Sequence, residues 1–159
     1  MNYSLKLFLF GIQFFLLSSC NEDDNNTSLM NQQVVNETAI TVEILDLINE
    51  HRNSIGLTPL QSNTTAVELA ISHSQYMINQ QAISHDNFDQ RAQVLQDQLN
   101  ATGWAENVAS RYGTAEGVVN GWLSSPGHKR NIEGNYTHTG IAAVKDANGY
   151  IYYTQLFYR

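Results

Sequence analysis

Two histidines and one glutamate are the side chains best suited to chemistry in this chain. His85 follows Ser84 at the end of a helical pattern, Glu106 is followed by Asn107, and His128 stands in a Ser-Pro-Gly-His turn. Each of the three lies at the boundary of a predicted element, so we expect them to converge on one polar cleft. Two neutral imidazoles and a carboxylate offer three ligands to Zn²⁺ or another divalent cation, and the carboxylate also suits a general base.

The same residues also suit a hydrogen-bonded His–Glu–His network that shapes the cleft without a catalytic metal, and we favour this interpretation. The three residues come from separate segments and no His-Glu-x-x-His helix is present, so their spacing gives a metal no independent support. A serine nucleophile is disfavoured, because the chain has no Gly-x-Ser-x-Gly elbow and Ser125 adjoins a Pro-Gly turn. His73 lies within an apolar helical stripe and is predicted to be a packed, hydrogen-bonded core residue.

The N-terminal segment, residues 1–19, predicts a lipoprotein signal peptide. Lys6 precedes an apolar run from Leu7 to Leu17, which is shorter than the roughly twenty residues that span a bilayer. Cys20 is the only cysteine, and after Leu-Ser-Ser it resembles the bacterial lipobox, in which the thiol is acylated. We therefore expect no disulfide, a lipid anchor at Cys20 and an extracytoplasmic location at the outer membrane or the cell surface.

The composition is acidic, with a formal net charge of −7. Its scattered Lys and Arg residues do not attract nucleic acid or anionic lipid, so we expect no nucleic-acid partner and membrane association only through the lipid. Residues 20–37 are polar and are predicted to form a flexible acidic tether. Their acidic start resembles an outer-membrane sorting tag and equally suits an ordinary linker. Residues 38–159 are long enough for one folded domain.

Hydrophobic periodicity predicts four helices followed by a β-hairpin. The helices are expected over residues 39–55, from a cap at Ser62 or Asn63 to a break at Ile83, over residues 90–99, and from Thr114 to Pro126. The strands are expected at residues 137–145 and 150–158, joined by an Asn-Gly turn. Residues 104–110 suit either a short strand or an extended loop. Both hairpin strands carry apolar or small residues on both faces, which predicts an α+β fold in three layers, helix–sheet–helix.

Several short motifs occur in a fixed order along the chain. They are Leu-Ile-Asn-Glu-His-Arg at 47–52, Ala-x-x-His-Ser at 70–74, Ser-His at 84–85, Glu-Asn-Val-Ala at 106–109, Trp-Leu-Ser-Ser-Pro-Gly-His-Lys-Arg-Asn-Ile at 122–132 and Thr-Gly-Ile-Ala at 139–142. Over about residues 40–159 this ordered set resembles the CAP superfamily, which includes cysteine-rich secretory proteins, antigen 5 venom allergens and plant pathogenesis-related proteins. The closest resemblance is to its bacterial branch.

The resemblance implies a three-layer α-β-α sandwich with a central antiparallel sheet, and a cleft lined by two histidines and two acidic residues. By position, His85 and His128 match the two histidines and Glu106 matches the first acidic residue. The second acidic position is Ser125 here, so the tetrad is incomplete. We expect Asn107 and Asn131 to support the cleft by holding nearby backbone groups.

The CAP scaffold hosts several unrelated functions, so the sequence leaves three hypotheses. The first, which we favour, is a lipid-anchored binding module whose His/Glu cleft takes a small molecule, a lipid, a cell-envelope component or a divalent cation. The second is a metal-dependent, peptidase-like hydrolase that uses the same three residues. The third is an adhesion or interaction domain in which the cleft is vestigial.

Overall fold

A computed structural model describes residues 34–159, and the predicted signal peptide, Cys20 and most of the predicted tether lie outside the described residues. The helices are α1 Thr38–Ser54, α2 Thr64–Gln80, α3 Phe88–Leu99, α4 Ala115–Ser124 and α5 Pro126–Ile132. The strands are β1 Gln61–Ser62, β2 Trp104–Ser110, β3 His138–Lys145 and β4 Ile151–Tyr158. Of the two alternatives for residues 104–110, the strand is therefore correct.

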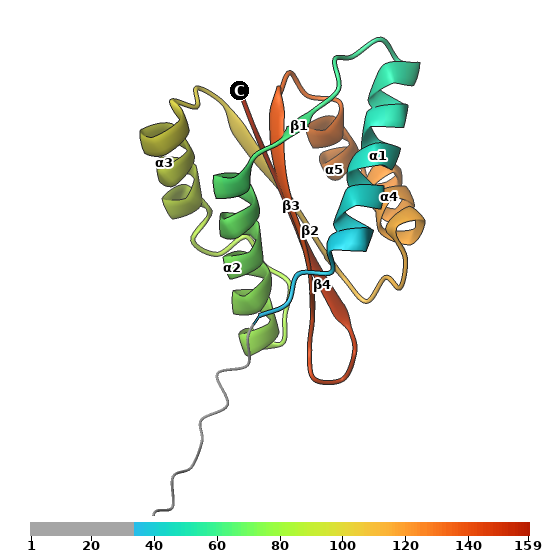
Figure 1. The fold of residues 1–159 in the computed structure, drawn as a ribbon, viewed down its shortest axis with the longest axis vertical. Coiled ribbons are helices and arrows are strands. Elements are labelled where there is room, and N and C mark those ends of the chain that lie inside the picture. The colour runs from blue at the N-terminus through green and yellow to red at the C-terminus, as the bar shows by residue number, and fades with distance from the viewer. Residues whose placement is uncertain (1–33) are drawn as a thin grey trace, which may run out of the picture. The chain divides into compact units, whose positions relative to one another are not determined.

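The four strands form one sheet in the order β1-β3-β4-β2. Helices α2 and α3 cover one face of the sheet, and α1, α4 and α5 cover the other (Figure 1). This arrangement confirms the predicted α+β fold of three layers. The sheet is mixed and not purely antiparallel, because β1 runs parallel to β3 while β4 pairs antiparallel with both β3 and β2.

Alternate residues of β4 divide between the two layers of helices, as the period of two in a strand requires. Tyr153 and Phe157 are fully buried in the apolar cluster that also contains Trp122 of α4. Thr154 points to the opposite face, where its hydroxyl lies 2.8 Å from the hydroxyl of Ser74 in α2. On this second face Gly140 of β3 allows close approach, since a Cβ there would collide with the backbone of α2.

The ends of the helices confirm two predicted capping residues and differ from prediction at two helix starts. Asn63 caps α2 by accepting from the backbone N–H of Ala66, and Thr114 caps α4 in the same way, as their residue types predict. The third helix begins at Phe88, two residues before its predicted start. The predicted Pro-Gly-His turn is instead the first turn of α5, because the fixed φ and missing N–H of Pro126 suit the first position of a helix.

Residues 36 and 37, at the end of the predicted tether, already contact the sheet. The backbone N–H of Glu37 donates to the carbonyl of Ala143 at 2.8 Å, and the N–H of Ala143 donates to Oδ1 of Asn36 at 2.8 Å. The ordered contacts of the domain thus begin slightly before residue 38. None of the helices within residues 34–159 combines the length and the apolar character needed to cross a bilayer.

Candidate functional site

Strand β2 forms one edge of the sheet and carries Glu106. In an antiparallel pair, only alternate residues of β2 form backbone hydrogen bonds with β4. The residues between them, Trp104, Glu106 and Val108, direct their backbone carbonyls away from β4. Each of these carbonyls accepts a hydrogen bond from a side chain. The Trp104 carbonyl accepts from Tyr136 Oη at 3.3 Å, and the Glu106 carbonyl accepts from Asn131 Nδ2 at 3.2 Å. The Val108 carbonyl accepts from Trp122 Nε1 at 3.3 Å. The contacts of Trp122 and Asn131 dock α4 and α5 on the edge of β2, and Tyr136 docks the segment after α5. Together they protect this edge from pairing with another strand.

Asn107 and Asn131 connect β2 to the helix that carries His128. Nδ2 of Asn107 donates to the backbone carbonyl of His128 at 3.2 Å, and Nδ2 of Asn131 donates to Oδ1 of Asn107 at 2.9 Å. Asn107 thus holds the backbone carbonyl of His128. Asn131 holds the carbonyl of Glu106 as well, so both amides fix the position of α5 relative to the glutamate.

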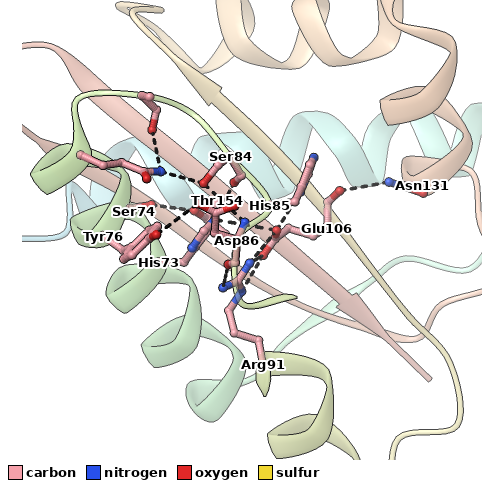
Figure 2. A network of polar contacts seen from close by, with 12 residues as sticks. His73, Ser74, Tyr76, Ser84, His85, Asp86, Arg91, Glu106, Asn131 and Thr154 are labelled. Carbon is pink, nitrogen blue, oxygen red and sulfur yellow. Dashed lines mark hydrogen bonds and ion pairs between the residues drawn. The ribbon is translucent and has the colours of Figure 1, made fainter. Parts of the chain in front are cut away.

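The side chain of Glu106 is buried and is engaged by two partners on the α2–α3 side of the sheet (Figure 2). Arg91 of α3 binds it with two parallel hydrogen bonds, from Nε to Oε2 at 2.7 Å and from Nη2 to Oε1 at 2.8 Å. The ring of His85 contributes a third, with Nδ1 lying 2.8 Å from Oε1. Such bidentate guanidinium–carboxylate pairs are strong and fix orientation as well as charge.

The bond between His85 and Glu106 determines which nitrogen of the imidazole carries the proton. A carboxylate paired with a guanidinium only accepts hydrogen bonds, so Nδ1 of His85 must be the donor. In the neutral ring Nε2 is then the unprotonated nitrogen. The side chain of His85 is 53% exposed, which makes this Nε2 a solvent-facing acceptor whose orientation Glu106 sets.

His73 of α2 is a buried, hydrogen-bonded core residue, as its place in the apolar stripe predicted. Its Nε2 donates to the backbone carbonyl of Ser84 at 2.8 Å and lies 3.8 Å from Oε1 of Glu106. Burial lowers the pKa of His73, although the Ser84 contact and the charge of Glu106 oppose this. Through the bond to Ser84, this neutral ring holds the loop that presents His85.

His128 lies in the first turns of α5 and is half-buried. Burial lowers the pKa of its imidazole, and the charge of the neighbouring His85 lowers it further. Within residues 34–159 the His128 ring has no hydrogen bond to another side chain, so it approaches His85 without joining the Glu106 network directly. Ser125, the fourth tetrad position, is a half-buried residue between α4 and α5.

The predicted zinc ligands do not form a ready-made three-ligand site. Both oxygens of Glu106 are occupied by Arg91, and one also accepts from His85. Across residues 34–159, no group of three or more His, Cys, Asp or Glu side chains is arranged to hold a metal ion. Glu106 is therefore a charge-paired carboxylate that orients the imidazole of His85, and we derive no step through a metal.

A hollow of about 480 Å³ lies beside His85. It is lined by His85 and by the start of α3, namely Asn87, Phe88, Asp89 and Gln90. A volume of this size is within the range of small-molecule sites, roughly 300–1,000 Å³. The exposed face of the histidine thus borders a space that a ligand can enter.

Arg91 is the functional residue that the sequence analysis missed. It is 7% exposed, next to the buried Ala92 and four residues before the buried Leu95. A cation on the apolar face of a predicted helix is a signal that it has a buried anionic partner, since buried charges are almost always paired. The helical pattern alone did not name that partner, because Glu106 lies on a different element.

Comparisons with known proteins identify the family of this domain. The sequence pattern of the cysteine-rich secretory protein family, CAP, matches residues 45–157. The chain belongs to the CAP family. This CAP domain is 32% identical over 127 residues to YlbC, an uncharacterised membrane protein of Bacillus subtilis, and the match covers 76% of this chain but only 35% of YlbC.

Two solved structures show the same CAP fold. An outer surface protein from Borrelia burgdorferi superposes with a TM-score of 0.71 at 21% identity, covering 80% of this chain and 97% of that one. An extracellular protein of Bacillus anthracis that contains an SCP domain superposes with a TM-score of 0.66 at 27% identity, covering 78% of this chain and 41% of that one. The CAP domain described here thus resembles domains from surface and extracellular proteins.

Proposed function

We propose that this CAP protein is an extracytoplasmic binding module whose ligand contacts the exposed face of His85. The observation that carries the proposal is the contact of His85 Nδ1 with the buried Glu106, which Arg91 holds in place. This contact leaves the second nitrogen of the His85 ring toward the solvent, and the His85 side chain is 53% exposed. His128 contributes a second imidazole near His85, whose charge lowers the pKa of the His128 ring.

The chemistry of the two rings indicates what kind of group the ligand presents. His85 offers an acceptor at Nε2, and the lowered pKa of His128 keeps that ring neutral near pH 7. The site therefore suits a hydrogen-bond donor such as a hydroxyl, an amide N–H or an ammonium group. Cell-envelope components and small polar metabolites carry such groups, and the adjoining hollow gives them room.

We expect ligand retention to depend on His85 and His128 but not on a histidine elsewhere. Removing either ring deletes one contact, which should lower affinity by about tenfold. The protein is purified as wild type and as His85→Ala, His128→Ala and His51→Ala, and the co-purified small molecules are identified by mass spectrometry. His51 is a matched control because it pairs with Glu133 on the opposite layer. Identical profiles from all four proteins would refute the proposal.

The location of the protein is the second part of the proposal, since Cys20 lies outside the described residues. We expect the Cys20→Ser protein to leave the membrane fraction and appear in the soluble extracytoplasmic fraction, because acylation contributes about 0.8 kcal/mol per buried methylene. The measurement is immunoblotting of fractionated cells. Equal membrane retention of the serine variant would show that the anchor is not at Cys20.

A hydrolase is the second candidate, because the same His–Glu pair resembles an oriented general base. Nε2 of His85 can accept a proton from a water, with Glu106 stabilising the charged ring. Such an enzyme would convert the small molecules that co-purify with the protein, whereas a binding module would release them unchanged. An adhesion domain with a vestigial cleft would retain no molecule through His85.

A further inference from the structure

A second hollow lies on the opposite layer of the domain, between α1 and α4, which pack side by side (Figure 1). Its volume is about 540 Å³. Its walls are Leu47, Glu50, His51 and Ser54 of α1, and Glu116, Val119, Asn120 and Leu123 of α4. It is separate from the His85 site, which lies on the α2–α3 side, and it does not depend on the function proposed above.

The spacing of the lining residues gives the hollow its shape. On each helix they follow the pattern i, i+3, i+4 and i+7, which is one face over two turns. Two turns extend about 10 Å, so the hollow is a groove that runs along both helices. A third helix can pack in the groove between two neighbouring helices when its apolar side chains interdigitate with theirs.

The groove has an apolar base and acidic borders. The half-buried Leu47 and Leu123 supply most of the apolar surface, and Val119 adds little because it is 4% exposed. The exposed carboxylates of Glu50 and Glu116 stand on the two sides. Neither carboxylate forms an ion pair with any residue between 34 and 159.

The surface around the groove extends this negative charge. On α1, Glu43 and Asp46 are also exposed, one turn before Leu47 and Glu50. Among the neighbouring cations, Arg52 is buried inside the domain, and Lys129 lies 3.7 Å from Glu133. The groove therefore presents uncompensated negative charge along an apolar strip.

We propose that the α1–α4 groove docks a basic amphipathic helix of a partner protein. The apolar face of that helix would lie on Leu47 and Leu123, and its Lys or Arg residues would pair with Glu50 and Glu116. The inference follows from the groove's length, its apolar base and its charge, which together match helix-in-groove recognition. Opposite charges at the border would set the orientation and the rate of association.

The test uses the full chain carrying Cys20→Ser, so that no acyl group competes for the groove. The probe is a fluorescent peptide of about 15 residues made of Leu and Lys, with Leu at i, i+3, i+4 and i+7. Its dissociation constant is measured by fluorescence anisotropy in about 0.1 M salt, where surface charges are partly screened. A peptide with the same composition in scrambled order is measured in parallel.

Two double variants separate local recognition from general attraction. Glu50→Lys/Glu116→Lys reverses the groove charges and is expected to weaken binding at least tenfold. Glu68→Lys/Asp97→Lys makes the same change in net charge at exposed positions of α2 and α3, and is expected to change binding less than about twofold. The scrambled peptide is expected to bind at least tenfold more weakly.

Three results would overturn the proposal. Equal weakening in both double variants would show attraction by net charge alone. Equal binding of the scrambled peptide would show that no helical face is recognised. An absence of binding by the parent protein would show that the groove does not accept a basic amphipathic helix.

Discussion

Replacement of Arg91 by Met is expected to destabilise the CAP domain by about 3–5 kcal/mol. The guanidinium makes two hydrogen bonds to the carboxylate of Glu106 and one, at 2.8 Å, to the backbone carbonyl of Asp86. Without it, the carboxylate remains in a site that is 5% exposed, with only His85 and His73 nearby. The free-energy cost of an unpaired buried charge is much larger than the net stabilisation that the intact ion pair contributed.

The free energy of unfolding is measured by urea denaturation. The double variant Arg91→Met/Glu106→Leu should recover most of the loss, because it removes both charges and fills the space. Arg130→Met is the matched control: Arg130 is exposed on α5, and its loss should change stability by less than about 0.5 kcal/mol. A loss below about 1 kcal/mol for Arg91→Met would mean that Glu106 does not need the arginine.

Arg52→Met is the second change with a large expected effect, again about 3–5 kcal/mol. Arg52 is 2% exposed at the end of α1, and it donates to four backbone carbonyls at distances of 2.6 to 3.1 Å. Those carbonyls belong to Thr58, Ile132, Gly134 and Tyr136. Each buried acceptor left without a donor costs roughly 1–3 kcal/mol, and only part of this is regained by water.

The same variant should also loosen the end of α5 and the segment after it, since Ile132 is the last residue of α5 and Gly134 and Tyr136 follow it. Hydrogen exchange of the α5 amides should therefore accelerate together with the loss of stability in urea. Arg52→Lys should recover little, because an ammonium cannot span four acceptors as the planar guanidinium does. A fully stable Arg52→Met protein would show that these carbonyls are satisfied in another way.

The sequence predicts most of the fold because the elements carry strong local signals. The apolar stripe of α2, the Asn63 and Thr114 caps and the Asn-Gly hairpin each depend on residues close together in the chain. The two-residue β1 and the seven-residue α5 were missed, since so few residues give no period. In α5 the Pro-Gly pair reads as a turn, and only its position after Ser125 reveals a helix start.

The candidate site was predicted in part for the same reason. His85 and Glu106 could be named from their motifs, and the structure brings them to 2.8 Å. Arg91 could not be assigned to Glu106, because their contact joins α3 to β2 and depends on how the layers pack. The carboxylate of Glu106 is thus paired with the guanidinium of Arg91 and orients His85. The residue types alone did not distinguish this role from that of a metal ligand.

The central claim is that Glu106 makes Nδ1 the protonated nitrogen of His85 and leaves Nε2 free toward the solvent. The most direct test is a long-range ¹H–¹⁵N correlation spectrum of the protein with ¹⁵N-labelled histidine, recorded at a pH where the ring is neutral. We predict the Nδ1–H tautomer for His85, and a shift toward Nε2–H in Glu106→Leu. If wild-type His85 instead carries its proton on Nε2, the carboxylate does not orient the ring and the proposed acceptor does not exist.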